Sequence, residues 1–267
     1  MCRSLWINDR LDSVRSAAAT LGEMGPKLDY LILNAGVLAP PNPSFSEDGF
    51  ERTVSSTLLG HHVLVTALLE QRSLGADARI VIAGSEAATG TVMGFHPADM
   101  QALADDAFDG DVGAAVRAQV RMEPPATYKP GDVYATAKVF VAQWAAELAT
   151  RLPEGMTVVT VSPGSAPDTN AARNANFFMR TFLIPFFKHM PGMSHSIAEG
   201  ARCYLDAAAR GREVTGQFLA SAPKKVTGPL RVVDLPGAQP SARAVTWAVT
   251  EELTGSRVPS AASSLGR

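Results

Sequence analysis

The sequence predicts an α/β fold with a doubly wound, largely parallel sheet. Short apolar runs rich in β-branched residues alternate along the chain with longer stretches of helical periodicity, which is typical of βαβ units. Three of these runs end in small-residue turns, "NAG", "GS" and "SPG", as expected where a buried strand stops. Strands of this kind need helices on both faces of their sheet.

The expected elements follow one another in a regular order. Each strand is a short buried run bounded by turn residues, and each helix shows apolar residues at helical spacing. The expected strands are 28–36, 78–85, 155–164 and 215–222. The expected helices are 47–71, a short one between 96 and 120, 132–151, 196–209 and 243–255. Residues 1–255 are expected to form one domain, and the small polar tail 256–267 is expected to be disordered.

Composition excludes several classes of protein. The 267 residues are 46% hydrophobic and 19% charged, which suits a globular domain. A net charge of −2 and a pI near 6.2 offer no basic surface for nucleic acid. Cys2 and Cys203 lie far apart without metal-ligand spacing, so neither a metal site nor a disulfide framework is expected. With no signal-like h-region and no apolar run long enough to span a bilayer, the expected location is the cytoplasm.

One pair of residues suggests proton chemistry. Tyr134 and Lys138, in "YATAK", lie one helical turn apart on the same face of the helix expected at 132–151. An ammonium beside a phenol favours the phenolate and lowers its pKa, so that the phenol could exchange a proton near neutral pH. The alternative is a surface tyrosine and a solvated lysine on an amphipathic helix.

The strand ends suggest where a ligand would bind. In parallel sheets ligands bind at the carboxyl ends of the strands, and small residues in the turns there let a ligand approach the backbone. The same glycines and prolines also serve as ordinary turn residues, so this evidence supports a site without defining its chemistry.

Taken together, these motifs resemble the short-chain dehydrogenase/reductase family. The matching residues are "NAG" at 34–36, Ser85 at a strand end, "YATAK" at 134–138 and "PG" at 163–164. "DGFERTVSSTLLGHHVLVTALL" and "WAVTEELTG" resemble helices of the family's retinol-dehydrogenase-like branch. The resemblance covers nearly the whole chain and implies a Rossmann-like sheet, an NAD or NADP cofactor, and interconversion of a carbonyl and an alcohol.

The resemblance also assigns catalytic roles. Tyr134 would be the acid/base, Lys138 would lower its pKa and bind the nicotinamide ribose, and Ser85 would hold the substrate oxygen. Thr57 stands where the branch has an asparagine that holds a water next to the lysine, and its hydroxyl could substitute.

Cofactor contacts are implied in the same way. Asn34, Ala35 and Gly36 would pass beside the adenosine ribose, whereas Pro163, Gly164 and Thr169 would flank the nicotinamide and the phosphates. For Ser85 and Thr169 the alternative is an ordinary hydroxyl at a strand end.

The chain departs from the family before the first expected strand. The family's glycine-rich turn, which binds pyrophosphate at a helix N-terminus, has no counterpart, because residues 1–33 contain only Gly22 and Gly25. The opening residues resemble the family's third strand and its helix, with Trp6 where the family commonly has an aspartate. We therefore expect a sheet without its first two strands, in a chain that is N-terminally truncated, and an unpaired edge at 28–34.

The substrate is expected to be small and lipophilic. The stretch 177–187 holds five of the chain's 11 phenylalanines where the family has a substrate lid. The alternatives for this stretch are a hydrophobic contact in a homodimer and a patch that binds a membrane surface. The long insertion 86–133 is expected to add a helix at the pocket rim, and its aspartates (Asp105, Asp106, Asp109, Asp111) to form a solvated face.

The sequence gives little support to a serine hydrolase or to a catalytic histidine. A serine hydrolase would need a G-x-S-x-G elbow, which the sequence lacks. His61 and His62 lie within an expected helix and are interpreted as structural. The alternative function is a catalytically silent relative of the family that serves as a binding or subunit module.

Overall fold

The central feature of the molecule is a five-stranded sheet. The computed structural model describes residues 10–165, 194–222, 225–235 and 237–259. The strand order is β1-β2-β3-β4-β5, with β1 to β4 parallel and β5 antiparallel to β4. This sheet confirms the predicted α/β class. The strands are β1 (Leu28–Leu33), β2 (Leu74–Ala83), β3 (Thr157–Val161), β4 (Phe218–Ala220) and β5 (Arg231–Val232).

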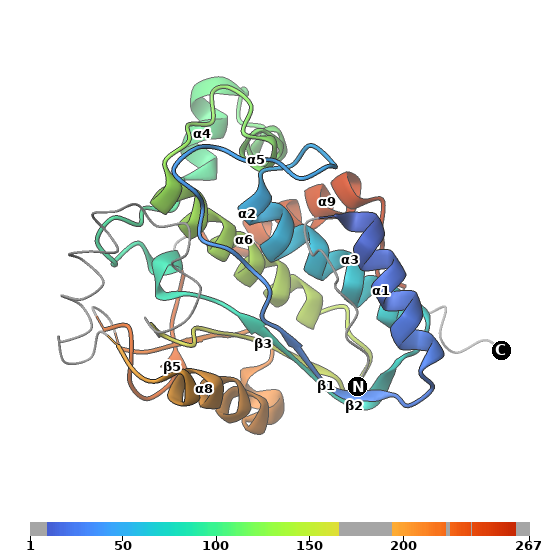
Figure 1. Cartoon of the computed structure of the whole chain (residues 1–267). Helices are drawn as coiled ribbons and strands as arrows, with labels where there is room; N and C mark the ends of the chain where they lie inside the picture. The colour runs from blue at the N-terminus through green and yellow to red at the C-terminus, as the bar shows by residue number, and fades with distance from the viewer. Residues whose placement is uncertain (1–9, 166–193, 223–224, 236, 260–267) are drawn as a thin grey trace.

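Helices cover the two faces of the sheet unequally (Figure 1). α8 (Ile197–Ala209) packs against β2 and β3 on one face. The other long helices gather on the opposite face: α1 (Leu11–Glu23), α3 (Gly60–Glu70), α6 (Pro130–Ala149) and α9 (Pro240–Thr254). Within the described ranges, no helix is both long and apolar enough to cross a bilayer.

The sheet separates two apolar clusters because side chains alternate along each strand. On β2, Ile80 and Ile82 belong to the larger cluster with the buried Trp144 of α6. Val81 points the other way, into a smaller cluster with Tyr204 of α8. The β-branched run that predicted this strand is therefore buried on both sides, as a central parallel strand requires.

Several boundaries differ from the prediction. The helix expected at 47–71 begins at Arg52, because the Glu51 side chain accepts a hydrogen bond from the Val54 N–H and caps it. It then runs through α2 (Arg52–Val54) and a π-helical segment at Ser55–Leu59 before α3. The insertion holds two helices where one was expected, α4 (Met100–Ala107) and α5 (Val112–Arg121), each capped by an aspartate side chain.

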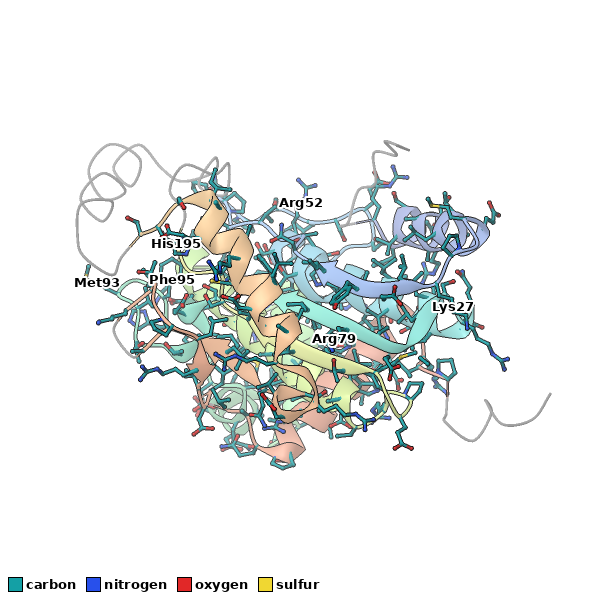
Figure 2. The ribbon with its side chains drawn as sticks, turned by 90° about the horizontal axis from the view of Figure 1, so that it is seen from below. Lys27, Arg52, Arg79, Met93, Phe95 and His195 are labelled. Carbon is teal, nitrogen blue, oxygen red and sulfur yellow. The ribbon has the colours of Figure 1, made fainter. Side chains whose placement is uncertain are left out.

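β1 lies at one edge of the sheet. Within the described residues no strand pairs with its outer side. Tyr30 and Ile32 are 57% and 44% exposed, because α8 reaches only as far as β2 and β3. Figure 2 looks at this side of the molecule, where Arg79 of β2 donates a hydrogen bond to the carbonyl of Ala208 in α8.

The residues that follow α9 are docked on the domain. His62 Nε2 contacts the Ser256 carbonyl at 2.9 Å, and Val258 packs against the larger apolar cluster. These contacts involve the first residues of the segment 256–267, which was expected to be a disordered tail. Residues 260–267 lie outside the described ranges, as does the phenylalanine-rich stretch 177–187.

Candidate active site

The candidate site lies where the parallel strands end. Asn34 follows β1, Ser85 follows β2, and Pro163 and Gly164 follow β3. The carboxyl ends of parallel strands share one edge of the sheet, which brings these turns together. The long helix α6 presents Tyr134 and Lys138 to the same region.

Ser85 and Tyr134 lie close together. The Ser85 side chain is near enough to the phenol to lower its pKa, although 48 residues separate the two along the chain. Ser85 also caps the 3-10 turn at Glu86–Thr89, because its hydroxyl accepts from the Ala87 N–H at 3.2 Å. The insertion returns over the phenol, where the Phe95 ring packs edge-on with centroids 5.9 Å apart. This proximity places the two predicted residues as one unit.

Lys138 lies one helical turn beyond the tyrosine and is buried. Its Nζ is 5.6 Å from the centroid of the Tyr134 ring and donates to the Ala83 carbonyl at 2.8 Å. Burial lowers the pKa of Lys138 from 10.5 to about 8, since a charge is less stable away from water. A surface tyrosine with a solvated lysine is therefore excluded.

The Tyr134 phenol does not behave as the sequence predicted. Burial raises its pKa above 10, the Ser85 side chain partly opposes this, and the carboxyl of Glu86 adds to it. The expectation of a lowered pKa is wrong in this structure, because desolvation of the phenol is the largest influence on its pKa. The phenol consequently holds its proton at neutral pH.

The turn after β1 passes next to the lysine. A Cβ on Gly36 would lie 3.3 Å from Thr57 Oγ1 and 3.5 Å from Lys138 Nζ, so both groups border the same small space. Thr57 Oγ1 is buried and has no hydrogen-bond partner among the described residues. Thr57 Oγ1 and Lys138 Nζ therefore both border the space next to Gly36.

The two histidines of α3 differ in surroundings. His61 is fully buried, and burial together with the Lys138 charge lowers its pKa to about 3. His62 accepts from Trp144 Nε1 at 3.0 Å and lies against Trp247, so it joins α3, α6 and α9. The structural interpretation is supported for His62, whereas His61 lies beside the candidate site.

The predicted cofactor residues are distributed along the same edge. Asn34, Ala35 and Gly36 are exposed, and Asn34 Oδ1 accepts from the Tyr204 hydroxyl at 2.6 Å. The Pro163 carbonyl contacts His195 Nε2 at 2.6 Å, and the Gly164 N–H donates to Ser162 Oγ at 3.3 Å. Thr169 lies outside the described ranges.

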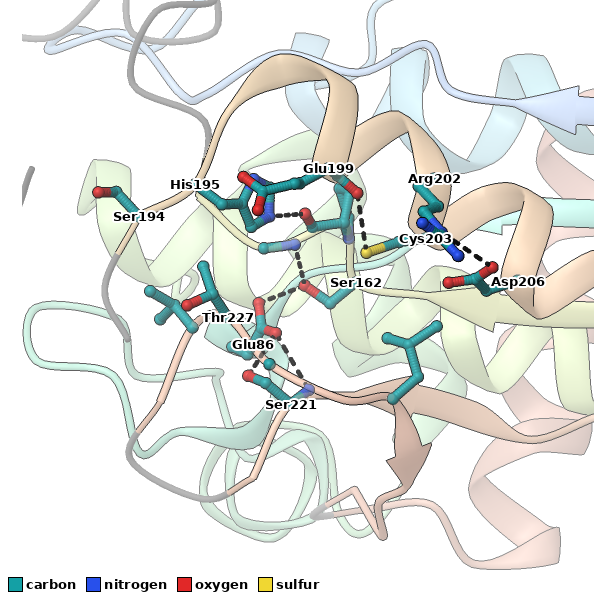
Figure 3. Close-up of a pocket in the computed structure, with 15 residues that line it drawn as sticks. Glu86, Ser162, Ser194, His195, Glu199, Arg202, Cys203, Asp206, Ser221 and Thr227 are labelled. Carbon is teal, nitrogen blue, oxygen red and sulfur yellow. Dashed lines mark hydrogen bonds and ion pairs between the residues drawn. The ribbon is translucent and has the colours of Figure 1, made fainter. Parts of the chain in front are cut away.

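A cavity of about 400 Å³ opens beside these turns (Figure 3). Its wall includes several polar residues to which the sequence analysis gave no catalytic or binding role: Glu86, Ser162, His195, Cys203 and Ser221. Glu86 could have been noticed as an acidic residue directly behind Ser85 at a strand end. The serines carried no signal, because serine is common in turns.

No cluster of three or more potential metal ligands occurs in the described part of the chain. Asp111 of the predicted solvated face caps α5 and pairs with Arg117 at 3.5 Å. Its neighbours Asp105, Asp106 and Asp109 are exposed, as expected.

Comparison with known proteins identifies the chain's relatives. It is 27% identical to retinol dehydrogenase 13 of Homo sapiens over 224 residues, which cover 82% of this chain and 60% of that protein. It is 31% identical to the chloroplastic protochlorophyllide reductase of Pisum sativum over 192 residues, 67% of this chain and 46% of that protein. The chain belongs to the short-chain dehydrogenase/reductase family. It spans about half the length of the curated relatives it matches, and no family model matches it.

Two solved structures have the same fold as this chain. An uncharacterised protein from Mycobacterium paratuberculosis superposes with a TM-score of 0.62 at 23% identity, over 95% of this chain and 75% of that chain. The NADPH-bound carbonyl reductase from chicken fatty liver gives a TM-score of 0.52 at 17% identity, over 80% of this chain and 72% of that chain. Both likenesses support the Rossmann-like assignment.

Proposed function

We propose that this chain is an NAD(P)-dependent oxidoreductase that interconverts a carbonyl and an alcohol on a small, lipophilic substrate. The observation that carries the proposal is the grouping of Ser85, Tyr134 and Lys138: the Ser85 side chain acts on the phenol at close range, and the Lys138 ammonium is 5.6 Å from the centroid of the phenol ring. Two relatives are named for retinol and for protochlorophyllide. Both are largely apolar molecules, which supports a lipophilic substrate.

The side chains define the proton chemistry. In reduction, the Tyr134 hydroxyl gives its proton to the carbonyl oxygen, while the Ser85 hydroxyl holds that oxygen as negative charge develops. The phenolate left behind is stabilised by Lys138, whose pKa of about 8 keeps it mostly charged at neutral pH. A raised pKa keeps Tyr134 protonated, so the resting site holds the phenol in the acid form that carbonyl reduction uses.

The nicotinamide half of a dinucleotide fits the residues present. Among the described residues, Lys138 Nζ donates one hydrogen bond, to the Ala83 carbonyl. An ammonium has three donors, so it could also bind a ribose hydroxyl. Gly36 leaves room beside it that a larger side chain would take. Pro163 and Gly164 would border the nicotinamide, and the bound dinucleotide would supply the hydride.

The pyrophosphate half has less support. Of the two glycines before β1, Gly22 lies within α1 and Gly25 in the turn after it, so neither opens a helix towards the site. Because helix N-termini and glycine-rich turns provide most pyrophosphate contacts, we expect dinucleotides to bind no tighter than about millimolar. Assays of this chain therefore need cofactor at millimolar concentration.

A catalytically silent relative, acting as a binding or subunit module, is the second candidate. It is favoured by the Tyr204 hydroxyl, which already occupies Asn34 Oδ1, the atom proposed to pass beside the adenosine ribose. In that case the site residues would be retained without turnover.

The experiment is to compare carbonyl reduction by the wild type and Tyr134→Phe, with a panel of apolar aldehydes and ketones. Tyr134→Phe keeps the ring but removes the transferable proton, so turnover should fall by roughly 10²-fold or more. Tyr30→Phe is the matched control, because Tyr30 lies in the edge strand β1 and its side chain is exposed. A Tyr134→Phe variant that keeps most of its turnover would exclude the acid/base role, and an inactive wild type would favour the silent module.

A further inference from the structure

Glu86 joins the ends of three strands. It follows Ser85 at the end of β2 and is only 6% exposed. Its Oε2 accepts a hydrogen bond from the hydroxyl of Ser162, which follows β3. Its Oε1 lies 3.0 Å from the hydroxyl and 3.4 Å from the amide nitrogen of Ser221, which follows β4. Figure 3 shows this cluster at the wall of the cavity.

The serine hydroxyls determine where the protons lie. Ser221 Oγ has one proton but two oxygen neighbours, the Lys225 carbonyl at 2.7 Å and Glu86 Oε1 at 3.0 Å. A carbonyl can only accept, so the Ser221 proton belongs to the shorter contact with Lys225. The contact between Ser221 and Glu86 then requires a proton from the carboxyl.

The second serine is consistent with this arrangement. Ser162 Oγ accepts from the Gly164 N–H at 3.3 Å and uses its single proton towards Glu86 Oε2. A neutral carboxylic acid, with one donor and further acceptor sites, satisfies every contact in the cluster. If Glu86 were a carboxylate, the single proton of the Ser221 hydroxyl could serve only one of its two contacts. The other contact, with Glu86 or with the Lys225 carbonyl, would then have no proton between its two oxygens.

We propose that Glu86 is held as a proton-bearing carboxylic acid that fixes the ends of β2, β3 and β4, and so positions Ser85 and the Pro163–Gly164 turn. This inference rests on the proposed function for its catalytic consequence. Glu86 touches Ser162 and Ser221, so it acts through the backbone that carries Ser85 and Gly164 and is a positioning residue. Three strand ends tied to one side chain keep the site in a single geometry.

The surroundings of Glu86 favour the neutral form. Burial raises the pKa of Glu86 above its usual value, although the serine hydrogen bonds partly oppose this. Ionisation would also raise the pKa of Tyr134, which faces it from α6, and that of Cys203. The one arginine on the described cavity wall, Arg202, pairs with Asp206 at 3.7 Å. The other titratable side chains that face Glu86 around the cavity are His195, Glu199 and Cys203.

The first test compares the stability of the full-length wild type and Glu86→Gln against pH. Glutamine keeps one donor and one acceptor but cannot ionise. Because the native pKa of Glu86 is raised, its stabilising contribution is present at low pH and is lost as pH rises through that pKa. As pH rises above about 4.5, the ordinary pKa of this side chain, the wild-type denaturation midpoint should therefore fall relative to that of Glu86→Gln.

If the denaturation midpoints of the wild type and Glu86→Gln change with pH in the same way, the proposal is overturned. That result would mean that the native carboxyl is already ionised and that all its partners donate to it. This readout needs no turnover, so it decides the protonation state whether or not the chain proves to be an oxidoreductase.

The second test measures positioning by turnover. Glu86→Ala should lower kcat by about 10-fold or more while Glu86→Gln restores most of that loss, because only glutamine can bridge Ser162 and Ser221. Equal losses in both variants would contradict a positioning role by hydrogen bonding. If Glu86→Ala does not fold, the pH comparison of the wild type with Glu86→Gln still decides the proposal. An inactive wild type counts against the proposed function alone.

Discussion

Replacing Lys138 by methionine should make the protein more stable, because the native site holds a charge out of water. Burial lowers the pKa of Lys138 from 10.5 to about 8, which corresponds at pH 7 to about 3 kcal/mol of native-state destabilisation. Methionine fills a similar volume without a charge. Losing the hydrogen bond to the Ala83 carbonyl costs about 1 to 2 kcal/mol. The net expectation is a variant about 1 to 2 kcal/mol more stable than the wild type.

The effect has a definite dependence on pH. Because the native pKa of Lys138 is lowered, the unfolded chain binds more protons between about pH 8 and pH 10.5. Wild-type stability therefore rises with pH across that window, and the advantage of Lys138→Met shrinks by about 1 kcal/mol between pH 7 and pH 9. The same variant should lose carbonyl reduction, which separates a functional lysine from a structural one.

The assay is urea unfolding followed by circular dichroism at both pH values. Lys27→Met is the matched control, since Lys27 is exposed (Figure 2) and its removal should change stability by less than about 0.5 kcal/mol. A Lys138→Met variant clearly less stable than the wild type, with a gap that does not change with pH, would refute the reasoning. Lys138 would then serve the fold and carry no buried charge.

The two histidines of α3 give further predictions. His61 has a native pKa of about 3, so stability should be lost as pH falls below about 6.5, by about 2 kcal/mol at pH 5. Both His61→Leu and the polar control His61→Asn should abolish that part of the acid sensitivity in urea titrations, and a persistent loss in both would contradict it. His62→Phe should cost about 2 kcal/mol at pH 7, because Trp144 Nε1–H loses its buried acceptor. Thermal melts with no fall in midpoint would disprove this.

Periodicity in the sequence was sufficient to predict the four parallel strands of the described sheet. Strands buried on both faces leave long apolar β-branched runs, and β2 and β3 match theirs. The boundaries were harder, because single contacts decide them. The Glu51 cap moves one helix start to Arg52, and Asp99 and Asp111 cap separate helices where one was expected. β5 could not have been predicted, since it is two exposed residues paired to β4.

The sequence predicts those residues of the candidate site whose positions depend on local spacing along the chain. Tyr134 and Lys138 share a helix face, and Ser85 ends a strand, so pattern and resemblance together placed them. The Glu86 cluster depends on contacts between residues as far as 135 positions apart, which no local pattern encodes. The prediction that the pKa of Tyr134 is lowered was wrong for a similar reason. Burial raises that pKa, and the ring is partly covered by Phe95 of the insertion, a tertiary contact that no local pattern encodes.

Transfer of a labelled hydride tests the central claim most directly. The wild type would be incubated with millimolar NADPH or NADH, deuterated at the nicotinamide carbon that gives the hydride, and with an apolar aldehyde. Mass spectrometry of the alcohol then follows the label. The account predicts deuterium at the former carbonyl carbon with the wild type, and roughly 10²-fold less labelled product with Tyr134→Phe. Equal amounts of labelled product from both proteins, or none from a folded wild type at saturating cofactor, would contradict it.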